Sequence, residues 1–455
     1  MQINEFLQSV CEQIKYKPIR NTISEELKNH IEDKKEELIS LGQNEQEAER
    51  NAVEQMGDAK IIGKELNEIH RPRLDWKLLI ILLILLVFGF IVSYIITLNE
   101  KTEMMKYMEQ NVTEYITTNY MPKYIIYVII GFAISIAVYF YDYKKLKSKP
   151  LILYGIATLV IIITLLFGIS INGVKFFRIG NHGIRANAIA IPLYIIAFIG
   201  FLEDINKENK LTQIFKKKNI KINANILSVI ALSIISLLML TLIPSLSSTI
   251  ILAITYLILA TRKISNESKN KKKHILILWG VPIILGIIFI FLEIIANPYF
   301  WNRFIAVYNP GEYKDGYGWI ALNRKQVIDS AQKIGEAGNM SDAIYLFDGY
   351  SNNEVISILA HFGWIPTIAL IVAVVAFSIK LVINSFKIKE QYGSLLILGI
   401  GCMFIFQSLF NIMMNFNLIS DGSFNLPFVT YGGENLVINM VCLALVFSTY
   451  RRKDI

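Results

Sequence analysis

Ten stretches of the chain are almost entirely apolar and carry few charged residues. A helix of about 20 residues crosses ~30 Å of hydrocarbon, and only helices or closed barrels satisfy every backbone hydrogen bond there. We therefore predict an all-α, polytopic membrane protein with about ten transmembrane helices. The predicted spans are residues 77–98, 122–141, 151–171, 186–203, 223–243, 246–262, 274–296, 354–380, 393–416 and 433–450.

Charges in the connecting loops predict the orientation of these spans. Basic residues follow the second, fourth and sixth spans and end the chain: Lys144, Lys145, Lys147, Lys149, Lys216–Lys218, Lys221, Arg262, Lys263, Lys271–Lys273 and Arg451–Lys453. Because Lys and Arg concentrate in cytoplasmic loops, we expect both termini in the cytoplasm and the long loop 297–353 outside. These loops account for the net charge of +8, and no basic surface interleaved with aromatic residues suggests nucleic-acid binding.

Residues 1–72 are polar and predict a small cytoplasmic helical domain ahead of the membrane domain, residues 73–455. Apolar residues recur at helical spacing in three segments: Phe6, Val10 and Ile14; Ile23, Leu27 and Ile31; Ala48, Ala52, Val53 and Met56. The pattern resembles a helical prefix domain found ahead of Gram-positive membrane proteins. Such a domain implies regulation or docking, and a plain cytoplasmic tether remains an equal alternative. The three cysteines, Cys11, Cys402 and Cys442, show no disulfide or metal-ligand spacing.

Polar residues in the last two spans are candidates for a site. Gln407, Asn411 and Asn415 are spaced four residues apart and so share one helix face, which we expect to point into the bundle. Interhelical hydrogen bonding is our preferred role for them, ahead of direct substrate contact. Further on, Gly432 and Gly433 allow close backbone approach, either to another segment or to a ligand.

The stretch from Asn425 to Leu436 resembles the near-C-terminal signature of the shape, elongation, division and sporulation (SEDS) family of bacterial membrane proteins. Four more segments agree in order: Asn172–Gly180, Arg303–Pro310, Gly316–Trp319 and Ile358–Ile365. The resemblance covers about residues 77–450, and its most specific part is Leu426–Gly433.

The resemblance implies a peptidoglycan glycosyltransferase acting on lipid-linked precursor in the bacterial cell membrane, in division, elongation or sporulation, with a transpeptidase as partner. Such a reaction needs a carboxylate to take the proton of the acceptor hydroxyl, and positive charge against the leaving pyrophosphate. The matching substrate-binding candidates are Arg303, Lys175, Arg178, Tyr431, Gly432 and Gly433. No cofactor or metal site is evident, and a divalent cation is expected only if the chain is catalytic.

Three acidic positions of the family are changed in this chain. The essential aspartate aligns with Asn352, whose amide cannot act as a general base. The family's Pro-Ser-Glu becomes Ala186-Asn187-Ala188, and its Pro-Asp-Leu-Gly becomes Pro244-Ser245-Leu246-Ser247. Glu354 or Asp348 could substitute for the lost aspartate. Their ordinary roles would be a first-turn helix acid and a turn residue.

Three functions remain open from the sequence. The first is a glycosyltransferase that uses a relocated carboxylate. The second is a non-catalytic scaffold or regulator of a cell-wall synthesis complex, which binds precursor or a transpeptidase. The third, export of a lipid-linked sugar, ranks last because the spans carry only scattered Asn, Gln and Ser.

Overall fold

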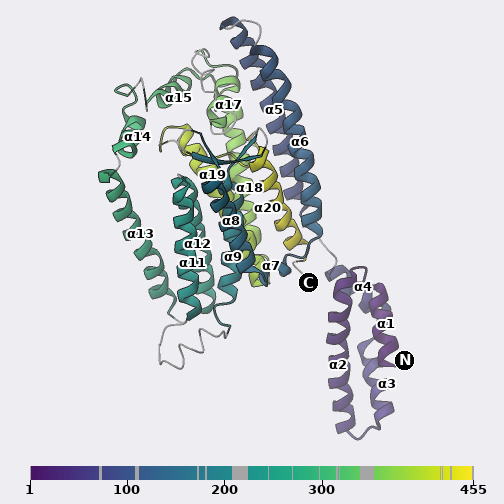
Figure 1. The fold of residues 1–455 in the computed structure, drawn as a ribbon. Coiled ribbons are helices and arrows are strands. Elements are labelled where there is room, and N and C mark those ends of the chain that lie inside the picture. The colour runs from purple at the N-terminus through teal and green to yellow at the C-terminus, as the bar shows by residue number, and fades with distance from the viewer. Residues whose placement is uncertain are drawn as a thin grey trace. The chain divides into compact units, whose positions relative to one another are not determined.

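The structure is a computed structural model of the whole chain (Figure 1). It describes residues 2–70, 74–107, 112–171, 174–179, 182–207, 224–243, 245–268, 270–296, 298–313, 316, 318–338, 353–420, 422, 424–430 and 433–452. The chain divides into two compact units. One comprises Met1–Asp75 with Thr449–Ile455, and the other comprises Trp76–Ser448.

The first unit is a small helical domain. Its elements are α1 (Ile3–Gln13), the 3₁₀ helix η1 (Lys17–Ile19), α2 (Arg20–Ser40), α3 (Glu45–Met56) and α4 (Ala59–His70). Phe6, Val10 and Ile31 lie in its apolar core, as their helical spacing predicts. The sequence patterns did not predict α4, which packs against α1. Gly63 permits this approach, because an added Cβ would lie 2.7 Å from the carbonyl oxygen of Val10.

The second unit is built of long apolar helices at the positions of the ten predicted spans. They are α5 (Trp76–Tyr107), α6 (Val112–Phe140), α8 (Pro150–Phe167), α9 (Ala186–Glu203), α11 (Ala224–Leu242), α12 (Leu246–Glu267), α13 (Lys271–Ala296), α18 (Trp364–Ser385), α19 (Gln391–Asn415) and α20 (Gly433–Arg451). Among the described residues, seven of these helices are long and apolar enough to cross a membrane. Together with the apolar α5, α6 and α13, they confirm a helical, multi-pass membrane protein.

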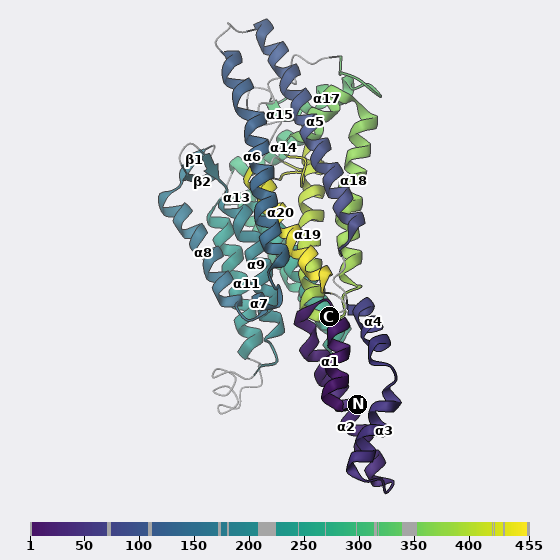
Figure 2. The same ribbon diagram turned by 90° about the vertical axis from the view of Figure 1, so that its right-hand side faces the viewer.

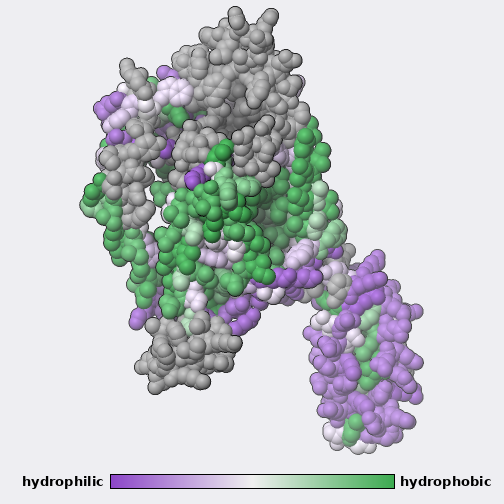
Figure 3. Space-filling view, in the orientation of Figure 1, coloured by the Kyte–Doolittle hydropathy of each residue, from purple (hydrophilic) through white to green (hydrophobic). Residues whose placement is uncertain are grey.

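Helices α9, α19 and α20 form the interior of the bundle. About 72% of α9 and 67% of α19 and α20 are buried, against 28% of α8. Helices α8 and α12 pack on α9, and α12 and α18 pack on α19. Figure 2 shows α8 beside α9 and α18 beside α19. The outer helices present apolar side chains over much of the bundle surface (Figure 3). This surface is the one that lipid would cover.

Short elements gather at the two ends of the bundle. One end, here the α17 end, carries α14 (Pro298–Tyr308), α15 (Trp319–Ser330) and α17 (Glu354–Phe362), and α7 (Lys144–Lys147) marks the opposite, α7 end (Figure 1). The predicted loop after the third span forms a small antiparallel sheet at the α17 end. Its strands are β1 (Ile169–Ile171), β2 (Val174–Ile179) and β3 (His182–Ile184), in the order β1-β2-β3.

The predicted span 354–380 is two helices rather than one. Helix α17 ends at Phe362, and α18 begins after Gly363, whose φ of 81° lies in the left-handed region. An added Cβ at Gly363 would lie 2.6 Å from the carbonyl oxygen of Gln332. The Trp364 amide donates to that same oxygen, which fixes the corner against the chain after α15. Gly363 is therefore required both for its backbone conformation and for close packing.

We predict that Gly363→Ala lowers the stability of the purified protein, because it adds left-handed strain and a backbone clash. The expected loss is about 1–3 kcal/mol, measured by thermal unfolding in detergent. Gly155→Ala is the matched control, since an added Cβ in the middle of α8 meets no atom within 4 Å. Equal melting temperatures for the two variants would contradict the role assigned to Gly363.

Candidate functional site

Glu354, the first residue of α17, is a buried carboxyl group held by side chains from two other segments. Only 5% of the residue is exposed. Its Oε1 accepts a hydrogen bond from the Thr430 hydroxyl at 2.6 Å, and its Oε2 accepts one from the Asn411 amide at 2.9 Å. Thr430 precedes α20, and Asn411 lies on α19. The carboxyl group therefore joins three segments that are far apart in the sequence.

The polar face predicted on the ninth span makes these contacts. Asn411 and Asn415 are completely buried. The Asn411 amide donates to the carbonyl oxygen of Phe424 as well as to Glu354, and the Asn415 side chain accepts from the backbone amide of Ile356 at 3.1 Å. The third predicted member, Gln407, is only half-buried. The structure thus gives Asn411 and Asn415 the role of hydrogen bonding between helices.

Arg324 on α15 binds Asn353, the residue before Glu354. No role was predicted for Arg324 from the sequence. Its guanidinium donates to the Asn353 side-chain oxygen through Nε, at 2.9 Å, and through Nη2. Its Nη1 donates to the carbonyl oxygen of Met414 at 3.1 Å. A helical pattern in the sequence could have indicated that Arg324 is buried. Ala321 and Val327 lie three residues before and after it, on the same helix face, and both are buried.

The environment of Glu354 favours its neutral form. Helix α17 lies outside the seven spanning helices. Burial raises the pKa of Glu354, while hydrogen bonds from Thr430 and Asn411 and the charge of Arg185 act in the opposite direction. The geometry agrees, because the single Thr430 proton faces two acceptors, Glu354 Oε1 and the Leu426 carbonyl oxygen at 2.8 Å. A protonated Glu354 would donate to Thr430 and leave the Thr430 proton for Leu426.

The basic residues predicted to bind pyrophosphate are not among the described contacts of Glu354. The Lys175 ammonium donates to the carbonyl oxygen of Leu165, near the end of α8, at 2.6 Å. Arg303 lies half-buried on α14, and Arg178 lies on β2. The cation whose charge reaches Glu354 is instead Arg185, just before α9.

Arg185 is paired with an acid from the predicted signature. Its Nε lies 3.2 Å from the Glu434 carboxylate in the first turn of α20, and both side chains are largely buried. No role was predicted from the sequence for Arg185 or Glu434. The two residues are 249 positions apart in the chain, and no local sequence pattern predicts a contact over that separation.

The paired glycines of the signature serve helix packing where the structure describes them. Gly433 begins α20 and is buried, and an added Cβ there would overlap the ring of Tyr127 on α6. This favours the first of the two predicted roles, close approach to another segment. Asn352, Asp348, Tyr431 and Gly432 lie outside the described residues.

Two of the changed acidic segments meet in one neutral cluster. The Asn187 amide donates to the Ser245 hydroxyl at 3.1 Å and to the Ser248 hydroxyl at 2.7 Å. The two hydroxyls are 2.6 Å apart, and all three residues are buried. Side chains that carry no formal charge thus hold the start of α9 to the start of α12.

No metal centre is found in the part of the chain that the structure describes. There, no group of three or more His, Cys, Asp or Glu side chains could hold a metal ion. The chemistry that the described site offers is therefore that of one buried carboxyl group, a buried Arg–Glu pair and several amides and hydroxyls.

The sequence comparisons find related bacterial proteins. The family model FTSW_RODA_SPOVE, described as cell cycle protein, matches residues 76–454. A probable peptidoglycan glycosyltransferase FtsW of Pseudoalteromonas translucida is 24% identical over 310 residues, which cover 66% of this chain and 72% of the relative. A protein of the same description from Nitrosomonas europaea is 22% identical over 392 residues, covering 84% and 93% of the two chains.

Solved structures share the fold. One match, with a TM-score of 0.62 and 16% identity, is a chain of a peptidoglycan synthase complex. That structure describes the coordination of polymerization and crosslinking by the complex. The match covers 84% of this chain and 98% of that one. The rod shape-determining protein RodA of Thermus thermophilus matches with a TM-score of 0.52 and 14% identity, covering 84% and 97%.

We predict that Glu354→Gln keeps stability close to that of the wild type, while Glu354→Leu loses about 1–3 kcal/mol. Glutamine has the shape and hydrogen-bonding groups of a protonated glutamate, so it can serve both Thr430 and Asn411. Leucine would leave the buried Asn411 donor without its acceptor. Thermal unfolding in detergent measures both variants.

The exposed Glu312 supplies a control for the loss of one carboxylate at the same end of the bundle. Glu312→Gln should unfold like the wild type. If Glu354→Gln were as unstable as Glu354→Leu, the carboxyl group would have to be ionised in the folded protein.

Proposed function

The chain belongs to the FtsW, RodA and SpoVE family of cell cycle proteins over residues 76–454, and from this membership we propose that it acts in bacterial cell-wall synthesis. We infer that it binds a lipid-linked peptidoglycan precursor at the α17 end without polymerising it. In this role it would be a scaffold or regulator of a cell-wall synthesis complex.

The family assignment supports the process and the ligand class. Relatives along most of the membrane domain are described as probable peptidoglycan glycosyltransferases, which act on peptidoglycan precursors. The arrangement of helices is similar to that of a chain from a peptidoglycan synthase complex. This chain keeps the helical frame of such proteins and lacks three acids that the family resemblance implies.

The observation that carries the non-catalytic role is that Glu354 is buried, with a protein donor on each carboxyl oxygen. Both carboxyl oxygens are bound by buried protein groups. A general base must reach the proton it removes and must be ionised when it does so. Glu354 is buried in an environment that favours its protonated form. Burial and the bonds to both oxygens keep the Glu354 carboxyl group from a substrate, and Asn352 at the family's aspartate position offers only an amide.

The orientation and the partner are part of the same proposal. Basic residues Lys144, Lys145 and Lys147 lie on α7, and Lys387 and Lys389 lie between α18 and α19, at the same end of the bundle. By the positive-inside rule this end faces the cytoplasm, with both termini, and the α17 end faces outward. The structural neighbour comes from a complex that couples polymerization to crosslinking, so a transpeptidase is the partner class we propose.

Glycan polymerisation by this chain is the second candidate function. It is favoured by the descriptions of its relatives and by the raised pKa of Glu354, which is a property of many acid–base catalysts. In that mechanism the Thr430 and Asn411 contacts would have to open when substrate binds. Because this opening is required, we rank polymerisation behind the non-catalytic role.

We predict that the purified full-length protein binds lipid-linked precursor and forms no glycan polymer, with or without Mg²⁺ or Mn²⁺. Binding is measured as a rise in melting temperature with precursor in detergent, and polymer is measured on gels. Glu354→Gln should bind precursor as the wild type does, because the carboxyl group acts in the fold and not on the substrate.

The polymer assay also separates the two candidates. Polymer made by the wild type and by the control Glu312→Gln, but lost at least a hundredfold in Glu354→Gln, would establish the enzyme and overturn our proposal. Absence of precursor binding, with the fold intact, would contradict both candidates.

A further inference from the structure

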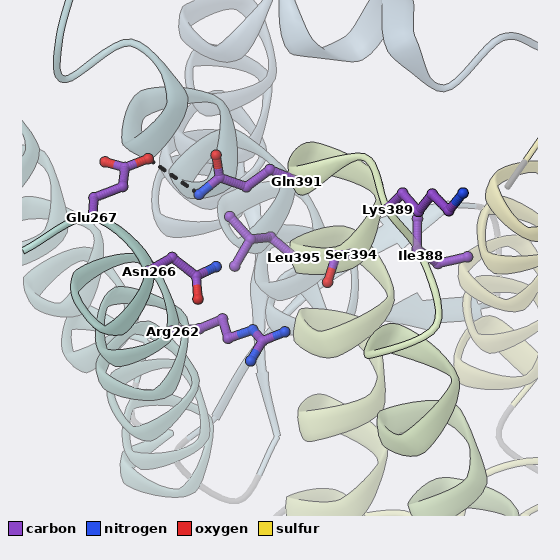
Figure 4. A pocket seen from close by; sticks show the side chains of 8 residues that line it. All are labelled: Arg262, Asn266, Glu267, Ile388, Lys389, Gln391, Ser394 and Leu395. Atoms are coloured by element: carbon purple, nitrogen blue, oxygen red, sulfur yellow. Dashed lines mark hydrogen bonds between the residues drawn. The ribbon is translucent and has the colours of Figure 1, made fainter. Parts of the chain in front are cut away.

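A polar pocket lies at the α7 end of the bundle, opposite Glu354. It has a volume of about 280 Å³ and sits between the last turns of α12 and the start of α19 (Figure 4). Its polar lining is Arg262, Asn266, Glu267, Lys389, Gln391 and Ser394. Arg262 was predicted to lie in a basic loop, whereas in the structure it lies on α12, which continues to Glu267.

The one acid in this lining is neutralised by its neighbours. The Lys263 ammonium lies 2.7 Å from the Glu267 carboxylate, and the Gln391 amide donates to the same carboxylate at 3.2 Å. Lys263 also pairs with Glu203 on α9 at 3.2 Å, and Lys147 pairs with Glu203 at 3.0 Å. The charge of Glu267 is therefore satisfied within the bundle, and the pocket keeps the positive charges of Arg262 and Lys389.

Arg262 is positioned by an aromatic ring rather than by an acid. Its guanidinium carbon lies 4.4 Å from the centre of the Phe386 ring. Within the described residues Arg262 forms no ion pair. A guanidinium stacked on a ring retains N–H donors along its edge, which suit two oxygens of one phosphate group. Figure 4 shows Arg262 and Asn266 extending from α12 toward the helix that carries Ser394.

Apolar residues border the same pocket. Ile388 and Leu395 complete its lining, and the Phe386 ring is more than half exposed. A free phosphate ion would gain nothing from these groups, whereas a lipid would place its glycerol and upper acyl carbons against them. The ends of α12 and α18 are also where the interface of a membrane would lie.

We propose that this pocket binds the phosphate group of an anionic phospholipid from the leaflet at the α7 end. Arg262 holds the phosphate oxygens, Asn266 and Lys389 add donors, and Ile388 and Leu395 contact the glycerol region. Basic pockets between membrane helices are known to suit anionic headgroups. The proposal is independent of whether the α17 end binds or polymerises precursor.

We predict that short-chain phosphatidylglycerol raises the melting temperature of the purified full-length protein in a saturable way. Phosphatidylcholine and inorganic phosphate at the same concentrations should have no comparable effect. In Arg262→Gln the phosphatidylglycerol concentration needed for half of the shift should rise roughly tenfold, because charge-assisted hydrogen bonds are lost.

Lys145→Gln removes one exposed positive charge at the same end of the bundle and lies outside the pocket. It should respond to phosphatidylglycerol as the wild type does. Lys389→Gln provides a second pocket variant on an exposed side chain, should Arg262→Gln fail to fold. The proposal falls if Lys145→Gln weakens the response as much as the pocket variants do. It also falls if phosphatidylcholine or inorganic phosphate acts as strongly as phosphatidylglycerol.

Discussion

The burial of Glu354 is the constraint on which the α17 end depends. A carboxyl group taken out of water must be paired, hydrogen-bonded or protonated, because its desolvation costs several kcal/mol. The Glu354 carboxyl group, at the start of α17, is hydrogen-bonded to α19 and to the segment before α20. Arg324 of α15 donates to the adjacent Asn353. Asn353 and Glu354 thus hold the start of α17 to α15, to α19 and to the segment before α20.

The sequence predicted the parts of this structure that follow from local patterns. Apolar length predicted the spans, and a four-residue spacing predicted that Asn411 and Asn415 point inward. Contacts between segments far apart in the sequence produce no such local pattern. The packing of the helices brings Glu354 to Thr430 and Arg185 to Glu434. The break at Gly363 was missed because apolar residues continue across it. A glycine is required there by the positive φ and by the approach of the segment after α15.

The neutral cluster connects two of the three segments that have lost an acid. In the sequence, the segments containing Asn187 and Ser245 are two separate departures from the family pattern. In the structure their side chains bond directly to each other and to Ser248. An acid restored at Ser245, the position of the family's aspartate, would face the neutral Asn187 amide and Ser248 hydroxyl. The two changed segments are therefore in direct contact, although the position of the family's glutamate itself, Ala188, is the residue after Asn187.

Helix α19 connects the two ends of the molecule. It has 25 residues, so at about 1.5 Å per residue it extends over roughly 37 Å, enough to cross the hydrocarbon. At the α7 end Glu390 caps its first turn, and at the α17 end Asn411 binds Glu354. A shift of α19 by one helical turn would break the Asn411–Glu354 bond at one end and the pairing of Glu390 with Lys147 of α7 at the other. The position of α19 along its neighbouring helices is therefore set by polar residues at its ends, although most of its buried residues are apolar.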